Sequence, residues 1–437
     1  MSELDLRSGT CPHTFNFGEH KGPIFPPEIS DMFIDALGED YDHATLAACS
    51  LTCHAWVHRS RFHIHSSVRI DSSSNFSRLK ELYSPERGLA NYVRSLSIDA
   101  CDMQADGLPA PHPWIAGNIA LLKDFTKVKR LALDGLNWND LTDETKTTIL
   151  TNYPMVDDLW MSTCDFRHPR HLVTLLQAFP NIKSIRMEAL ATDTVEWELM
   201  GDNTGSKLHL QWLDVGDVCT MPSVVTKWAS SYGSLSIENT HISWSHENPT
   251  GLSCLLECAG ASVKTLSLTL DSRITSHLVG SGSVRNHINL SQNTGIHSLK
   301  LHLRLESCDI ENLSWISDTL KSVTSRHLSH IAIYMAVLRV DHLIHIEWDS
   351  IDTALSSKLL EGLTDVTLCI LRPRKPHEGD ETSAFPGDWM AAKLPKLMGR
   401  RTITVRWHQL SCRRLSLGMT RLEDDLFPIY EPLECKF

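Results

Sequence analysis

The sequence predicts an α/β protein in which a short N-terminal helical unit precedes a long series of strand–helix repeats that share one parallel sheet. Apolar residues recur at helical spacing within the first 65 residues. Beyond them, a six-residue pattern with apolar residues at its first, fourth and sixth positions occurs ten times, at intervals of 22 to 35 residues. The length of 437 residues also exceeds what one compact core commonly holds, which favours an elongated array.

The N-terminal helical unit is predicted from residue 23 onward. Residues 1–22 are polar and contain three glycines, so we expect a disordered lead-in. A first helix should begin at the prolines before Glu28 and end near Gly38, with an apolar stripe along one side. A second helix should follow Asp42, a suitable N-cap, and a third should run from about Thr52 to Phe62. Three such short helices bury little surface, so the unit is expected to lean on a partner.

Residues 23–65 resemble a known domain type. The run Phe-Pro-Pro-Glu-Ile at 25–29, the run Leu-Ala-Ala-Cys-Ser-Leu-Thr-Cys at 46–53 and the pair Ala55-Trp56 are together similar to an F-box of the kind abundant in fungi. The chain departs from that pattern at Phe25, where leucine is usual, and at Thr52, where valine is frequent. Both departures put the strength of the expected contact in doubt.

This resemblance implies binding to a Skp-type adaptor and, through the adaptor, to a cullin scaffold. Carried over position by position, the expected adaptor contacts are Phe25, Pro26, Ile29, Phe33, Leu37, Leu46 and Trp56. The alternative is that Phe33, Leu46 and Trp56 only hold the three helices together, and the pattern leaves both roles open.

The repeats begin after residue 65. The copies of the six-residue pattern start at Val93, Val128, Val156, Ile182, Leu210, Tyr232, Val263, Ile296, Leu328 and Leu363, with weaker copies at His65 and Arg400. Because strand side chains alternate between the two faces, the fifth residue of each copy should point away from its apolar neighbours. These residues are Ser97, Ala132, Trp160, Arg186, Asp214, Ser236, Ser267, Lys300, Ala332 and Thr367.

Helical segments are predicted between the strands, at about 171–179, 252–259, 313–323 and 351–360. Strand–helix units of this kind stay half-exposed alone and build a core by stacking. Residues 66–410 therefore resemble an irregular leucine-rich-repeat-like solenoid, of the degenerate type found behind many F-boxes. Residues 372–387 are expected to form a loop and 411–437 a C-terminal cap or tail. The alternative is an α/β domain with a parallel sheet and no solenoid curvature.

The outward strand residues of a solenoid form its habitual contact surface. The candidates here for contact with a target are Trp160, Arg186, Asp214 and Lys300. One aromatic residue among opposite charges fits a protein target better than a nucleic acid. The alternative for Trp160 is that a neighbouring loop buries it.

Composition narrows the remaining function classes. A net charge of -12 argues against a general nucleic-acid binder, and no stretch approaches the roughly 20 apolar residues of a membrane span. The first 19 residues lack the apolar run of a signal peptide, so we expect a cytoplasmic or nuclear protein, or both.

No catalytic residue, metal site or cofactor is predicted. The nearest approach to a zinc pattern is Cys49 and Cys53 with His63 and His65, but the cysteines lie on expected apolar helix faces. The resemblance to an F-box followed by degenerate repeats implies a substrate-recognition subunit of a Skp-cullin-F-box ubiquitin ligase that binds an unknown protein target. Two hypotheses remain beside it, namely an F-box interaction scaffold without a role in degradation, and an enzyme with an unrecognised site.

Overall fold

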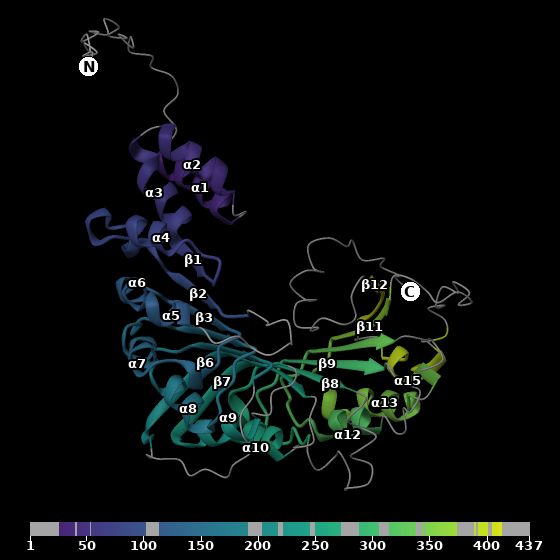
Figure 1. The fold of residues 1–437 in the computed structure, drawn as a ribbon. Helices are drawn as coiled ribbons and strands as arrows, with labels where there is room; N and C mark the ends of the chain where they lie inside the picture. The colour runs from purple at the N-terminus through teal and green to yellow at the C-terminus, as the bar shows by residue number, and fades with distance from the viewer. Residues whose placement is uncertain are drawn as a thin grey trace, which may run out of the picture. The chain divides into compact units, whose positions relative to one another are not determined.

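The chain divides into two compact units, Met1–Ser66 and Ser67–Phe437, which are described separately below. This computed structural model (Figure 1) describes residues 26–39, 42–52, 54–101, 113–190, 203–216, 222–244, 250–271, 288–305, 314–337, 343–344, 346–373, 389, 392–400 and 404–412. The predicted lead-in, Phe25, most of the predicted loop at 372–387 and almost all of the predicted tail lie outside these ranges.

The first unit contains three helices, α1 (Pro27–Glu39), α2 (His43–Thr52) and α3 (His54–Ser66). Proline opens α1, as its missing N–H allows. Asp42 caps α2 as predicted, because its Oδ1 accepts the backbone N–H of Thr45 at 3.0 Å. Helix α1 does not end at Gly38 but continues to Glu39. Gly38 instead allows close packing, since a Cβ atom there would meet the ring of His63 on α3 at 2.1 Å.

The buried interior of this unit is small. In its described part, the buried apolar side chains are Ile34 on α1 and Leu46 on α2. A polar contact adds to them, because Arg59 on α3 donates to both carboxylate oxygens of Asp35 on α1 at 2.6 Å. So few apolar side chains contribute only a few kcal/mol by burial, at about 1.5–3 kcal/mol for each large one.

The second unit is built on one twelve-stranded parallel sheet in which the strands follow one another in chain order (Figure 1). The strands are β1 (Ser67–Ile70), β2 (Ser95–Asp99), β3 (Arg130–Asp134), β4 (Asp158–Ser162), β5 (Ser184–Glu188), β6 (Asn203–Val215), β7 (Tyr232–Trp244), β8 (Thr265–Asp271), β9 (Ser298–Leu305), β10 (His330–Val337), β11 (Asp365–Pro373) and β12 (Thr404–Cys412). The prediction of a parallel sheet with its strands in sequence order is confirmed.

The register of the sheet follows the apolar pattern. Leu131 pairs with Leu159 and Leu159 with Ile185, and these side chains are buried. The residue after each one, such as Trp160 or Arg186, points to the opposite face, as the period of two requires. One face of the sheet therefore carries the apolar core and the other carries a polar row.

Helices cover the apolar face (Figure 1). They are α4 (Phe76–Leu82), α5 (Pro113–Gly117), α6 (Ile119–Asp124), α7 (Asp143–Thr151), α8 (Pro169–Gln177), α9 (Pro222–Ser230), α10 (Thr250–Ala259), α12 (Ser314–Ser322), α13 (Trp348–Leu355) and α15 (Pro395–Met398). Short 3-10 turns accompany them at Pro85–Arg87, Leu89–Tyr92, Trp138–Asp140, Gly260–Ser262 and Lys358–Leu360. Helices α8, α10 and α12 lie within two residues of their predicted ranges, whereas α13 begins three residues and ends five residues earlier than predicted. Large buried side chains such as Phe125, Phe179 and Trp228 fill the layer between helices and sheet.

The predicted copy at 232–237 is not the repeat that aligns with its neighbours. Strand β7 is long, and Leu235 and Ile237 pair with Leu208 and Leu210 in the first part of β6. Farther along β7, His241 pairs with Asp214 on β6 and with Ser267 on β8. The polar-face residue of this repeat is therefore His241 and not Ser236.

The last copy is also shifted. Strand β12 begins at Thr404, and Arg406 pairs with Thr367 of β11. The aligned apolar pair is Val405 and Trp407, so the predicted copy at 400–405 starts two residues too early. The strand also continues to Cys412, two residues past the predicted end of the repeat region at 410. Within the described ranges, no helix has the length and apolar character needed to cross a bilayer.

Candidate binding surfaces

An apolar stripe is exposed on α1. Ile29, Met32 and Phe33 are 38%, 67% and 65% exposed, and Ala36 is exposed as well. Positions i, i+3, i+4 and i+7 lie on one side of a helix, so these four residues form a continuous row, here termed the α1 stripe. Leaving three large apolar side chains in water is costly for so small a unit, and exposed apolar patches mark interaction sites.

The other predicted adaptor contacts differ in accessibility. Pro26 is exposed, and Leu37 and Trp56 are half-buried. Leu46 is 1% exposed, so its side chain packs the helices together and offers no surface to a partner, which corrects its assignment as a contact. Phe25 lies outside the described residues. Sequence reasoning missed Leu51, which is 88% exposed on α2.

The orientation of α1 is fixed by a charged contact with α3. Besides the two bonds from Arg59, the carboxylate of Asp35 lies 2.8 Å from Nε2 of His63. The hydrogen bond from Arg59, opposed by partial burial and aided by His63, lowers the pKa of Asp35 to about 2. The carboxylate therefore stays ionised at neutral pH, and the contact holds Asp35 against α3 while the α1 stripe is left exposed.

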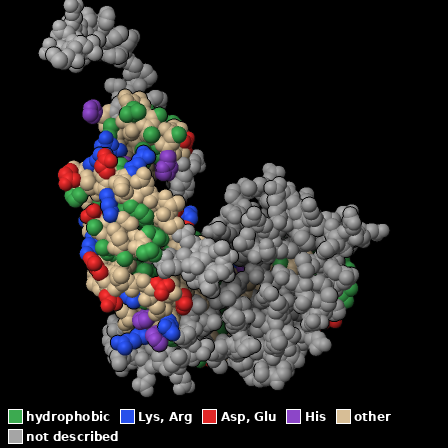
Figure 2. Space-filling view, viewed as in Figure 1, with side chains coloured by type: hydrophobic (Ala, Val, Ile, Leu, Met, Phe, Trp, Pro, Cys, Tyr) green, Lys and Arg blue, Asp and Glu red, His purple; other side chains and the backbone are tan. Residues whose placement is uncertain are grey.

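The polar face of the sheet, defined as the strand residues that alternate with the buried ones, carries paired charges. Arg69 on β1 binds Asp99 on β2, and Arg130 on β3 binds Asp158 on β4 at 2.6 Å. Figure 2 shows the same mixture on the visible surface of the described residues, where basic and acidic side chains lie side by side. A mixed surface of this kind has no extended basic field of the type that attracts phosphate backbones.

A connected polar network crosses the middle of this face. Asp214 on β6 is buried, its Oδ1 lies 2.7 Å from Nδ1 of His241 on β7, and its Oδ2 lies 3.4 Å from Nε of Arg186 on β5. The other ring nitrogen of His241 lies 3.1 Å from the hydroxyl of Thr269 on β8. The four groups thus link β5, β6, β7 and β8 across their polar face. Buried polar groups are retained when they are hydrogen-bonded in this way.

The structure separates the four predicted target contacts. Arg186 is half-exposed, and its guanidinium carbon lies 5.8 Å from the ring centre of Trp160, which is itself half-buried. Asp214 is buried beneath Arg186 and acts by holding it, which corrects its assignment as a direct contact. Lys300 is half-buried on β9, four strands from Arg186, so the two cations are about 19 Å apart at the usual strand spacing.

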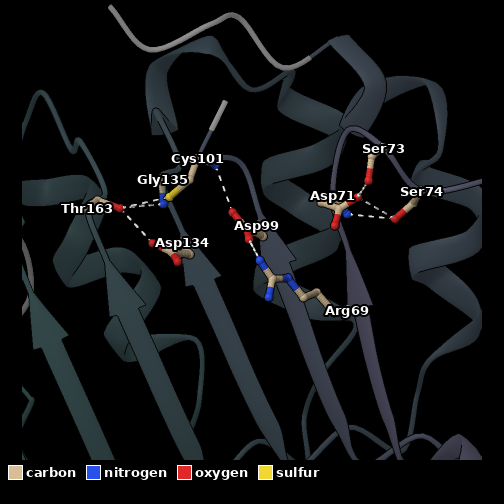
Figure 3. A network of polar contacts seen from close by, with 9 residues as sticks. All are labelled: Arg69, Asp71, Ser73, Ser74, Asp99, Cys101, Asp134, Gly135 and Thr163. Carbon is tan, nitrogen blue, oxygen red and sulfur yellow. Dashed lines mark hydrogen bonds and ion pairs between the residues drawn. The ribbon is translucent and has the colours of Figure 1, made fainter. Parts of the chain in front are cut away.

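Another polar cluster lies where the strands β1 to β4 end (Figure 3). Asp99, Cys101 and Asp134 bring three potential metal-ligand atoms within 4.8 Å of one another. Each already has a contact, because Arg69 pairs with Asp99, the Thr163 hydroxyl donates to Asp134 at 2.8 Å, and the same hydroxyl lies 3.5 Å from the Cys101 thiol.

The thiol of this cluster is a poor ligand at neutral pH. Loss of hydration around Cys101, with the carboxylate of Asp134 beside it, raises the pKa of the thiol to about 11. The Thr163 hydroxyl, directly after β4, also accepts the backbone N–H of Gly135, directly after β3, at 3.0 Å, and both residues have positive φ. These contacts cross-link the strand ends, and we assign the cluster a structural role.

Comparison with known proteins adds no assignment to these surfaces. No protein-family model matches the chain, and no curated protein matches it.

Proposed function

We propose that this chain is the substrate-recognition subunit of a Skp-cullin-F-box ubiquitin ligase. In this proposal residues 23–65 are an F-box that binds a Skp-type adaptor, and the repeats form a leucine-rich-repeat-like solenoid that binds a protein target. The catalytic steps of ubiquitin transfer belong to other subunits of such a ligase, and the assembly acts in the cytoplasm, the nucleus or both.

The observation that carries the proposal is the α1 stripe. Ile29, Met32 and Phe33 stay exposed in a unit whose described buried apolar residues are Ile34 and Leu46. A small helical unit that exposes large apolar side chains gains stability when a partner covers them. Three of the residues in the F-box resemblance, Pro26, Ile29 and Phe33, are exposed as a contact role requires.

The second unit supports the other half of the proposal. Its twelve strands pair in parallel and in chain order, which is the arrangement that stacked strand–helix repeats produce. The polar face offers exposed and half-exposed side chains from consecutive repeats, among them Arg130, Trp160, Arg186 and Trp212. A row of separate side chains on neighbouring strands is suited to an extended protein surface.

The test is the affinity of the full chain for a purified Skp-type adaptor, measured by titration calorimetry. Replacing Phe33 by Asp removes apolar contact area and places an unpaired charge in the interface, so we expect binding to weaken by about 100-fold or more. Arg61→Asp is the control, because it places the same acidic side chain at an exposed position of α3 outside the α1 stripe. Equal affinity of the wild type and the Phe33→Asp variant, or no binding by the wild type, would refute the proposal that residues 23–65 bind the adaptor.

A second measurement separates a ligase subunit from a scaffold. Proteins that the full chain captures together with the adaptor should accumulate in cells that lack this chain, and ubiquitinated forms of them should decline. Captured proteins whose abundance and ubiquitination stay constant would support a scaffold role instead.

A further inference from the structure

Arg186 is the guanidinium on the polar face that is best placed to bind a second partner. Its Nε faces Asp214 at 3.4 Å on one side, and its planar group lies over Trp160 on the other. The side chain is still 46% exposed. Within the described part of the chain these are the two contacts of Arg186, and the one with Asp214 is made by Nε and not by the two Nη groups. Arginine has five N–H donors in a fixed fork that matches a carboxylate.

The contact with Asp214 is looser than the comparable contacts in the sheet. Arg130 lies 2.6 Å from Asp158, and Arg69 lies closer still to Asp99. The carboxylate of Asp214 is also shared, because His241 lies at 2.7 Å from its other oxygen. Asp214 is thus held in place by His241 on β7. It positions Arg186 through the Nε atom of that side chain. A side chain held in its binding geometry loses less entropy when a ligand arrives.

Two tryptophans stand on either side of β5. Trp160 on β4 pairs with Arg186, and Trp212 on β6 pairs with Ser184, two residues before Arg186 on the same face. Trp212 is 37% exposed, although large aromatic side chains are commonly buried. Ser184, the neighbour of Trp212 on β5, has a small side chain and is half-buried. Tryptophan and arginine are the residue types that contribute most to protein interfaces.

The charges around this surface favour a singly charged anion. Asp158 lies two residues from Trp160 on β4, Glu188 lies two residues from Arg186 on β5, and Asp214 lies beneath. Even with Asp158 paired to Arg130, the carboxylates outnumber the guanidinium groups here, and such an excess would repel a phosphate dianion more strongly than a carboxylate. The aromatic pair would pack against an apolar neighbour of that carboxylate.

We propose that Trp160, Arg186 and Trp212 form an anchor site for a target segment in which an aspartate or glutamate stands beside an aromatic or large apolar residue. This inference rests on the proposed function for its partner class, since it specifies the protein target of the repeats. It narrows the contact surface to β4, β5 and β6.

The probe is a set of immobilised nine-residue peptides with Glu, Asp, Gln, Lys or phosphoserine at the centre and Trp, Phe or Ala beside it. The full chain should be retained best by Glu or Asp next to Trp or Phe. In the Arg186→Gln variant this preference should fall about tenfold or more, the size expected for charge-assisted hydrogen bonds. Arg69→Gln is the matched control, because it removes an exposed, aspartate-paired arginine from the same face on β1, outside β4 to β6, and should leave the preference unchanged.

A second variant excludes misfolding as the cause of a lost preference. Trp212→Ala changes a side chain that is already partly in water, so it should lower the aromatic preference and keep the melting temperature of the wild type. Equal retention by Glu and Gln peptides, stronger retention by phosphoserine, or an unchanged preference in Arg186→Gln would overturn the inference. The adaptor titration does not involve these peptides. If the chain fails to bind the adaptor but keeps its preference for acidic peptides, that result counts against the proposed function and not against this inference.

Discussion

Replacing Asp214 by Ala should cause one of the largest losses of stability available at a polar position of the sheet. The carboxylate is buried and receives contacts from His241 at 2.7 Å and Arg186 at 3.4 Å. Its removal leaves the buried ring of His241 without its acceptor and removes a charge-assisted contact to Arg186. A buried charged hydrogen bond of this kind is worth about 1.5–3 kcal/mol, and the stranded donor adds to the loss. We expect the free energy of unfolding to fall by about 2–4 kcal/mol.

The assay is urea unfolding of the full chain followed by tryptophan fluorescence and circular dichroism. Asp158→Ala is the matched control, since it breaks an arginine–aspartate pair on the same face with both side chains more exposed, at 61% and 29%. Exposed pairs contribute about 0–1 kcal/mol, so the control should lose at most that amount. Losses that agree within about 0.3 kcal/mol for the two variants would refute the importance given to the buried network.

Two further outcomes are expected. The lowered pKa of Asp35 means that its contact with Arg59 is fully present above pH 4 and is lost as the pH falls towards about 2, where the carboxyl protonates. Because that side chain is 34% exposed, the contribution should be about 1 kcal/mol, and Asp35→Asn should abolish the pH dependence of amide exchange in α1 and α3 after correction for intrinsic rates. Gly135→Ala should destabilise by about 2–4 kcal/mol, because φ is positive and the new Cβ would lie 2.7 Å from the backbone nitrogen of Cys101. Gly88→Ala shares the positive φ but meets open space, so thermal unfolding should show a loss of only about 1 kcal/mol; equal losses would contradict this account.

The strand order could be predicted from the sequence because the apolar pattern and the parallel register have the same cause, namely burial of alternate residues. At β7 the predicted strand start at Tyr232 is confirmed, but the predicted alignment with the neighbouring repeats is wrong, because Leu235 and Ile237 imitate a repeat inside a long strand. The aligned copy has Thr240 in the central position where the other copies have an apolar residue, so it does not match the apolar pattern. The spacing between copies could have indicated the correct alignment. A start at Ile237 lies 27 residues after Leu210 and 26 before Val263, in place of 22 and 31.

The binding surfaces could be predicted less well, because a period shows which residues share a face and not which face is covered. The stripe with Met32 and Phe33 follows from helical spacing, but its exposure depends on Ile34 taking the inward position against α2 and α3. Asp214 shows the same limit on the sheet. Its position on the polar face follows from alternation, while its burial depends on contacts with His241 and Arg186 that lie 27 and 28 residues away in the chain.

Hydrogen exchange of the full chain, with and without a Skp-type adaptor, tests the central claim most directly. If α1 carries the docking surface, amides in the segment that contains Ile29, Met32 and Phe33 should exchange at least about tenfold more slowly in the complex. The strands from β1 to β12 should exchange at unchanged rates, because the adaptor does not contact them in this account. Unchanged exchange in α1 at saturating adaptor, or protection confined to the sheet, would contradict the claim.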